Sequence, residues 1–361
     1  MKQIVLVALL FAPLAFAQVD PMDPMDPQAQ DSGGVTQWFV DGRSRYERTT
    51  LPGRDNIERT RFRLRAGARH FFDVFEIGAA VEGQLASSDN VDNLRNKDNE
   101  KSDGGSLDEL YARWGFAEGA ALTLGKTPLA AEFSPMLWDN DFRPVGVALN
   151  LDGSTQAAHS WRMSAAYYAP EHIFDEDTRM VVLQGGYRFE LGNGTSWEVL
   201  AGYMHFSDLD ALARVGLQRT NRRIGTPGTF TFLSDYRLAD LQLIGRTEVW
   251  NGRPLTLSVD VVKNVGADDF DQGIRSSLVI GDSRRGGWEA GFAYHRVQRD
   301  AVLSAFADAD WWFQSFYRGG MPWVGFGFTE NVRLRLAGFK ERRDGVSPNT
   351  DRVLLDLFTS W

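Results

Sequence analysis

Charged and apolar residues alternate with a period of two between residues 57 and 72. Phe62, Leu64 and Ala66 fall on one side of an extended chain, and five arginines fall on the other: Arg59, Arg61, Arg63, Arg65 and Arg69. Successive side chains of a strand point to opposite faces, and a dry protein core does not accept a row of guanidinium groups. The pattern therefore predicts a strand with water on its charged face and hydrocarbon on its apolar face.

The same alternation recurs along the chain from residue 35 onward. In the first expected strand, 35–49, Trp38 and Tyr46 point to one face, and Asp41, Arg43 and Glu47 point to the other. In lipid, only a closed barrel satisfies every backbone amide of such strands. We therefore predict an all-β fold over residues 35–361: a transmembrane, antiparallel, up-and-down β-barrel with a polar lumen.

Turn signals and longer polar segments divide this region into strands. Tight turns containing Gly, Asn or Asp are expected at 72–73, 118–119, 152–153, 192–194, 251–252, 285–287 and 330–331. Longer loops are expected at 87–106, 128–144, 169–178, 207–228, 266–273, 299–310 and 343–349. The rhythm predicts about 16 strands (about 14 to 18), with short turns in the periplasm, long loops outside and an aqueous channel between them.

One stretch of the predicted barrel has no clear assignment. Trp311, Trp312 and Phe313 lie within residues 299–324, where the alternation is weakest. These three aromatic residues fit a strand, an interfacial aromatic girdle or a loop folded back into the barrel.

The two ends of the chain indicate export. Residues 1–17 combine Lys2, an apolar run and the small-x-small site Ala15-Phe16-Ala17, which predicts a cleaved secretory signal. Residues 18–34 contain a repeat of Asp, Pro and Met and are expected to form a disordered periplasmic leader. The final strand ends on Trp361, as is typical of bacterial outer-membrane barrels read by the barrel-assembly machinery.

Composition narrows the choice of function. The 361 residues include 36 Gly, 24 Phe, 11 Trp and no Cys, and the formal net charge of -9 argues against nucleic acid as a partner. The five His residues lack metal-site spacing, and His159 and Ser160, as neighbours on a strand, face opposite sides. We therefore expect no enzyme, no metal and no cofactor.

A distinctive segment begins at Gly125-Lys126 and continues through Trp138-Asp139-Asn140-Asp141 to Pro144-Val145-Gly146. With the barrel pattern, it resembles a porin family of Gram-negative bacterial outer membranes. Two further stretches support the likeness, Asp260-Val261-Val262-Lys263-Asn264 and Tyr317-Arg318-Gly319-Gly320, although Met321-Pro322 replaces the polar residues usual in the family. The resemblance implies a barrel fold and passive diffusion through a water-filled pore; it assigns no site residues.

The inward positions of neighbouring strands predict a basic arc along the lumen. Its pore-lining members are Arg43, Arg45, Arg59, Arg61, Arg63, Arg65, Arg333, Arg335 and Arg352. By the resemblance to porins, the third outer loop folds inward as a constriction loop and sets an acidic edge opposite the arc, with Glu132, Trp138, Asp139 and Asp141. Such a transverse field favours polar solutes. The alternative is that the arginines only solvate the wall and pair with Glu47, Glu76, Glu82, Glu109 and Asp356.

Two functions fit the sequence. The first is an outer-membrane porin that passes small hydrophilic solutes and ions by diffusion, with anion preference set by the arc. The second is a substrate-specific channel, for a sugar for example, or a receptor-type barrel, with an aromatic slide formed by Trp138, Phe142, Trp311, Trp312 and Phe313. The expected partners are outer-membrane lipid, lipopolysaccharide and the barrel-assembly machinery; a homotrimer is one alternative for the oligomeric state.

Overall fold

The computed structural model describes residues 34–88, 103–156, 158–170, 178–192, 194–217, 219–284, 286–346 and 348–361. The predicted signal (1–17) and leader (18–34) lie outside the described residues, apart from Gly34. Most of the predicted loop 87–106 also lies outside them.

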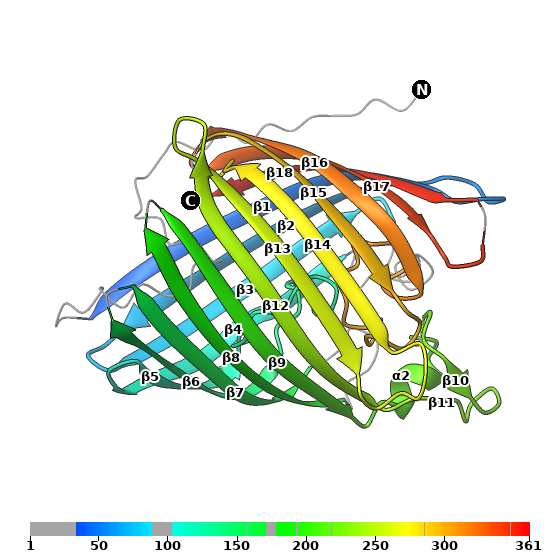
Figure 1. The fold of residues 1–361 in the computed structure, drawn as a ribbon, viewed down its shortest axis with the longest axis horizontal. Helices are drawn as coiled ribbons and strands as arrows, with labels where there is room; N and C mark the ends of the chain where they lie inside the picture. Colours follow the sequence, from blue (N-terminus) through cyan, green and yellow to red (C-terminus); the bar gives the residue numbers. More distant parts are fainter. Residues whose placement is uncertain are drawn as a thin grey trace.

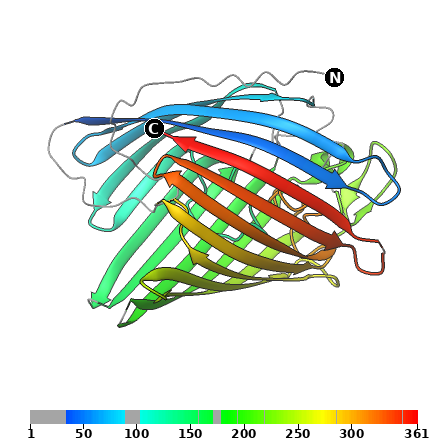
Figure 2. The same cartoon turned by 90° about the horizontal axis from the view of Figure 1, so that it is seen from above.

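Sixteen antiparallel strands of the described chain form one closed barrel (Figure 1, Figure 2). Every strand of the wall pairs with its neighbour in sequence order, and β1 pairs with β18 to close the ring. The strands are β1 (Val35–Thr50), β2 (Ile57–Phe71), β3 (Phe75–Ala86), β4 (Gly104–Ala117), β5 (Ala120–Lys126), β6 (Val145–Gln156), β7 (His159–Ala169), β8 (Arg179–Gly192), β9 (Thr195–Ser207), β12 (Tyr236–Val249), β13 (Arg253–Asn264), β14 (Gln272–Gly281), β15 (Gly287–Val297), β16 (Tyr317–Thr329), β17 (Val332–Arg342) and β18 (Thr350–Ser360). The predicted all-β barrel is confirmed.

The predicted loop 207–228 is longer than expected and reaches to residue 235. It carries the short helix α2 (Asp210–Arg214) and a small hairpin of β10 (Arg223–Ile224) and β11 (Thr231–Phe232), which extend from one end of the barrel (Figure 1). Within the described residues, no helix is long and apolar enough to cross a membrane.

Alternation along the strands separates an apolar outer face from a polar inner face. On β2, Phe62 and Leu64 are 52% and 55% exposed, whereas Arg61 and Arg65, which flank this stretch, are each 6% exposed. Large apolar side chains are likewise exposed on the other strands, for example Leu124 on β5 and Val324 on β16. An apolar outer face with every wall strand paired on both sides is the arrangement that a hydrocarbon environment requires.

One predicted turn is wrong. Residues 152–153 do not turn, because β6 continues to Gln156 and pairs Gly153 with Trp161 of β7. A Cβ atom at Gly153 would lie 3.0 Å from the Trp161 ring, so this glycine leaves room for an aromatic side chain. Elsewhere the turn signal holds: Gly119 and Asn251 have φ values of 65° and 64°, in the left-handed region that tight turns require.

Two long connections fold into the barrel instead of outward. We call residues 127–144, between β5 and β6, the first inner segment, and residues 298–316, between β15 and β16, the second inner segment. They meet at Trp138 and Phe306, whose rings stack with centroids 5.8 Å apart, and Phe306 also stacks on Phe206 of β9 at 5.7 Å. Trp311-Trp312-Phe313 therefore belongs to a loop folded back into the barrel.

Backbone hydrogen bonds join the two inner segments. The Asp139 N–H donates to the Phe306 carbonyl at 2.8 Å, and the Asp308 N–H donates to the Pro135 carbonyl at 3.0 Å. The side chains of both segments form one apolar cluster with inward residues of the wall, including Tyr236. Part of the lumen is thus filled with packed protein, and the two segments hold one another in place.

Candidate functional site

The nine arginines predicted to line the lumen occupy positions on the face of β1, β2, β17 and β18 opposite to the apolar outer face. The barrel register sets Arg43 opposite Arg63 and Arg45 opposite Arg61 across the β1–β2 pair. The seven arginines on β1, β2 and β18 are nevertheless paired with carboxylates, as the alternative interpretation of the sequence expected.

Glu47 is the centre of the first group of charges. It is 1% exposed and contacts the Arg59 Nε atom, the Arg61 Nε atom at 3.7 Å and the Arg352 Nη2 atom at 2.6 Å. Three guanidinium groups, two from β2 and one from β18, thus converge on one buried carboxylate of β1. Arginine suits such buried pairs because its planar group donates several hydrogen bonds and stays charged.

A second group surrounds Arg65. Its guanidinium lies 2.8 Å from Asp41, 3.2 Å from Asp108 and 3.5 Å from Glu109. A register shift between Ala80 and Val81 marks a β-bulge in the β3–β4 pair, and both Asp108 and Glu109 are buried. Strict alternation places only one of these two neighbours inside, and for this reason the sequence analysis missed Asp108.

The first inner segment reaches across the barrel interior. Near its start, Glu132 pairs with Arg162 of β7, and its backbone N–H and C=O bind the Gln184 side chain of β8 at 2.9 and 2.6 Å. Burial alone would raise the pKa of Glu132, but the hydrogen bond and the charge of Arg162 hold that pKa below its usual value. Glu132 is thus an anchor of the segment to the wall.

Near its end, the same segment contacts the basic arc directly. Asp141 lies 2.6 Å from the Arg63 guanidinium and 3.3 Å from that of Arg43. The expected acidic edge opposite the arc is therefore wrong for Asp141, because the segment is long enough to reach β1 and β2. Arg45 of the same arc is shared between Asp356 of β18 and Asp310 of the second inner segment.

The two arginines predicted on β17 lie in a different setting. Arg333 stacks over the Phe358 ring at 4.4 Å and Arg335 over the Trp323 ring at 5.4 Å. Cation–π contacts of this kind let a guanidinium keep its charge beside apolar surface. Neither residue lines the cavity described next.

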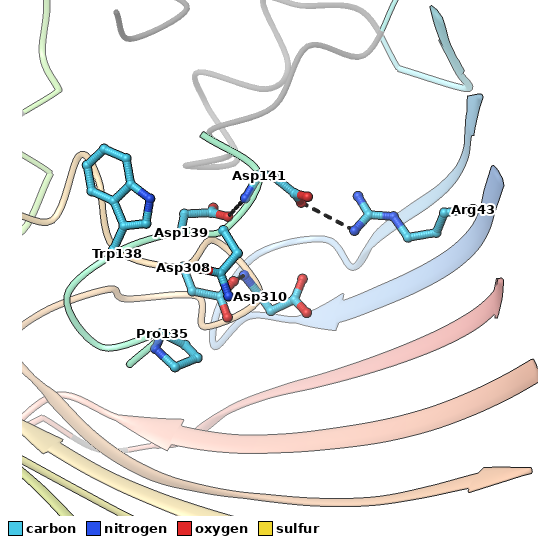
Figure 3. A pocket seen from close by; sticks show the side chains of 8 residues that line it. Arg43, Pro135, Trp138, Asp139, Asp141, Asp308 and Asp310 are labelled. Atoms are coloured by element: carbon cyan, nitrogen blue, oxygen red, sulfur yellow. Dashed lines mark hydrogen bonds and ion pairs between the residues drawn. The ribbon is translucent and has the colours of Figure 1, made fainter. Parts of the chain in front are cut away.

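A cavity of about 120 Å³ opens where both inner segments approach β1 (Figure 3). Its walls are Arg43, Pro135, Trp138, Asp139, Asn140, Asp141, Asp308 and Asp310. Figure 3 shows Asp141 between the Asp139 carboxylate, which accepts its N–H, and the Arg43 guanidinium. Sequence reasoning found the Arg43, Trp138, Asp139 and Asp141 part of this site but missed Asp308 and Asp310, because no local pattern shows that the second inner segment packs there.

The four carboxylates around the cavity differ in their partners. Asp310 is only partly exposed, which alone would raise its pKa, but the Arg45 charge holds that pKa well below the usual range. Asp308 accepts the Asp310 N–H at 2.8 Å and forms no ion pair with any described residue. Burial and the nearby Asp310 carboxylate raise the pKa of Asp308 to about 7. Asp308 therefore takes up a proton more readily than an exposed aspartate does.

The aromatic slide proposed for a sugar channel does not occur in this arrangement. Its residues are between 1% and 8% exposed and pack into the apolar cluster of the inner segments: Trp138, Phe142, Trp311, Trp312 and Phe313. Their rings fill space between the segments and the wall, so they offer no stacking face to a passing solute.

No family model matches this chain, and no curated protein matches it. Solved structures do resemble it across most of their length. The high-pH structure of Pseudomonas putida OprB is 12% identical, covers 90% of this chain and 94% of its own, and has a TM-score of 0.58. Salmonella typhi OmpF in complex with daunomycin is 11% identical, with 90% and 97% covered and a TM-score of 0.55.

A loop-deletion mutant of Vibrio cholerae OmpT, an outer-membrane protein, gives the same result. It is 12% identical, covers 91% of this chain and 99% of its own, and has a TM-score of 0.53. At these identities the likeness concerns the fold, which includes the closed ring of 16 strands. This chain therefore has the fold of the outer-membrane porins.

Proposed function

We propose that this protein is an outer-membrane porin that passes small hydrophilic solutes and ions by passive diffusion. The proposal is supported by an apolar outer face, a charged inner face and two connections folded into the interior. The observation that carries it is the charged cavity between the inner segments and β1, because charges act most strongly on an ion where the passage is narrow and water is scarce.

Ion preference is set at this cavity and not by the whole basic arc. Arg59, Arg61 and Arg352 contact the buried Glu47 and do not line the cavity, whereas Arg43 and Arg63 share Asp141, which does. A paired charge contributes little field at a distance of a Debye length, about 8 Å at 0.15 M salt. Selectivity therefore depends on Arg43, Arg63 and the neighbouring aspartates.

We further propose that the barrel is surrounded by outer-membrane lipid and lipopolysaccharide, and that the barrel-assembly machinery inserts it. A homotrimer stays a prediction.

The main functional test is single-channel recording of the refolded protein in planar bilayers under a salt gradient. Discrete conductance steps with a measurable reversal potential are expected, and correctly folded protein that conducts no ions would contradict the proposal.

Ion selectivity is expected to depend on pH through Asp308. Its pKa of about 7 means that the carboxylate is charged at pH 8 and mostly protonated at pH 6. Lowering the pH across this range removes negative charge from the cavity, so the reversal potential should move toward anion preference. The Asp308→Asn variant should show, at both pH 6 and pH 8, the reversal potential that the wild-type protein has at pH 6. A wild-type potential that is constant from pH 6 to pH 8 would rule out this role.

The orientation of the barrel can be tested by labelling, because the chain contains no Cys. Asp235→Cys places a thiol in the connection between β9 and β12, where the Asp235 side chain is 78% exposed, and Asn251→Cys places one in the tight turn between β12 and β13. A membrane-impermeant maleimide applied to intact cells should label position 235 and reach position 251 only after the outer membrane is permeabilised. The reverse pattern would invert the proposed orientation.

A further inference from the structure

Two carboxylates that play no part in the cavity lie on the inner face of the opposite wall. Asp240 of β12 and Asp260 of β13 are 5% and 1% exposed. The register pairs Gln242 with Asp260, and Asp240 with Val262, so the two aspartates are diagonal neighbours on the same face. Diagonal neighbours of this kind lie about 7–8 Å apart, so the two carboxyl groups share one small region of the inner face.

The oxygen atoms that converge at this point outnumber the donors beside them. The two carboxyl groups approach one another, and the Ser134 hydroxyl of the first inner segment approaches Asp260. Neither oxygen of Asp260, nor Asp240 Oδ1, nor Ser134 Oγ makes a hydrogen bond of good geometry with the described residues. Buried acceptors left without donors are costly, and two facing carboxylates repel each other as well.

Neighbouring donors do not resolve this arrangement. Gln242 Nε2 donates to the other oxygen of Asp240 and to the Glu132 carbonyl, both at 2.9 Å. Arg275 of β14 is the register partner of Asp260, but its guanidinium donates to Ser258 Oγ at 3.1 Å and makes no ion pair with Asp260 in the described structure. The pair of carboxylates thus has the Arg275 charge nearby but no cation in direct contact with it among the described residues.

We propose that Asp240, Asp260 and Ser134 bind a divalent metal ion, for which Ca²⁺ is the best fit, and that this ion fastens the first inner segment to β12 and β13. Ca²⁺ accepts carboxylate and hydroxyl oxygens in irregular geometry and completes its shell with water. The described residues contain no group of three or more His, Cys, Asp or Glu side chains suited to a metal, so the proposed set needs the Ser134 hydroxyl as its third ligand. Two carboxylates and a hydroxyl do not suit zinc, which is usually bound by His and Cys. The site does not depend on which solutes the barrel passes.

Calcium binding is tested on full-length protein refolded from inclusion bodies in detergent, which is free of lipopolysaccharide. After treatment with EDTA, equilibrium dialysis against radioactive Ca²⁺ should show about one equivalent bound per chain, as expected for a single all-oxygen site. Ca²⁺ should also raise the midpoint of thermal unfolding, because a ligand that binds only the folded state stabilises it.

Variants locate the effect. Asp260→Asn and Asp240→Asn should each lose both the bound equivalent and the rise in midpoint, and Ser134→Ala should weaken binding. Asp235→Asn, which changes an exposed carboxylate outside the pair, should leave both unchanged. Wild-type protein that binds no calcium, or whose unfolding midpoint responds to pH and not to Ca²⁺, would overturn the proposal, the second result indicating a shared proton. Because neither readout involves conductance, these outcomes are independent of porin activity.

Discussion

Glu47→Gln is expected to lower the free energy of unfolding of the barrel by about 3–5 kcal/mol, the usual cost of breaking a buried ion pair by removing one partner. Glu47 is 1% exposed, and its single carboxylate contacts the guanidinium groups of Arg59, Arg61 and Arg352. Gln keeps the shape of the side chain but leaves three guanidinium groups with insufficient negative charge. The measurement is equilibrium unfolding in urea of the protein inserted in lipid vesicles, followed by tryptophan fluorescence.

A matched control lies on the same two strands. Glu58 of β2 pairs with Arg48 of β1 at 3.4 Å, but these side chains are 52% and 51% exposed. Glu58→Gln should therefore change stability by only about 0–1 kcal/mol, as for other exposed pairs. Equal effects of the two substitutions would show that water reaches Glu47 and that the cluster around it is not buried.

The wall of the barrel could be predicted because its information is local. In a strand, neighbouring side chains point to opposite faces, so the apolar one of each pair faces lipid and the charged one faces the lumen. The positions of Phe62 and Arg63, and of Tyr46 and Arg45, follow from that rule alone. Glycine signals were less reliable, because Gly119 forms a turn and Gly153 makes room for Trp161. The residue type is the same at both positions, and its role depends on which side chain the neighbouring strand places beside it.

The cavity could be predicted only in part, because it depends on contacts between distant segments. Asp139 and Asp141 stood in a distinctive stretch of sequence, but Asp308 and Asp310 lie about 170 residues later in the chain, as the hydrogen bond from Ala309 to Asp139 shows. The alternation of apolar and polar residues along the chain does not predict that Trp138 stacks on Phe306. The pairing of the two inner segments is a packing result, and charge pairing at Asp141 follows from it.

Arg43→Gln combined with Arg63→Gln is expected to shift the reversal potential strongly toward cation preference. Both guanidinium groups contact Asp141, and Arg43 lines the cavity that also contains Asp139, Asp308 and Asp310. Removing two positive charges leaves the carboxylates there without compensation, so anions are repelled and cations attracted. Single-channel recordings of the double variant under a salt gradient measure the shift.

The shift should grow as the salt is diluted, because the Debye length increases from about 8 Å at 0.15 M to about 30 Å at 0.01 M. Asp141→Asn should move the potential in the opposite direction. The control is Arg333→Gln combined with Arg335→Gln, which removes the same charge from the inner face at positions stacked on Phe358 and Trp323, away from the cavity. If the Arg333 and Arg335 variant shifts the reversal potential as much as the Arg43 and Arg63 variant does, the whole basic arc determines ion selectivity. If only the Arg43 and Arg63 variant shifts it, selectivity is determined where the inner segments meet β1.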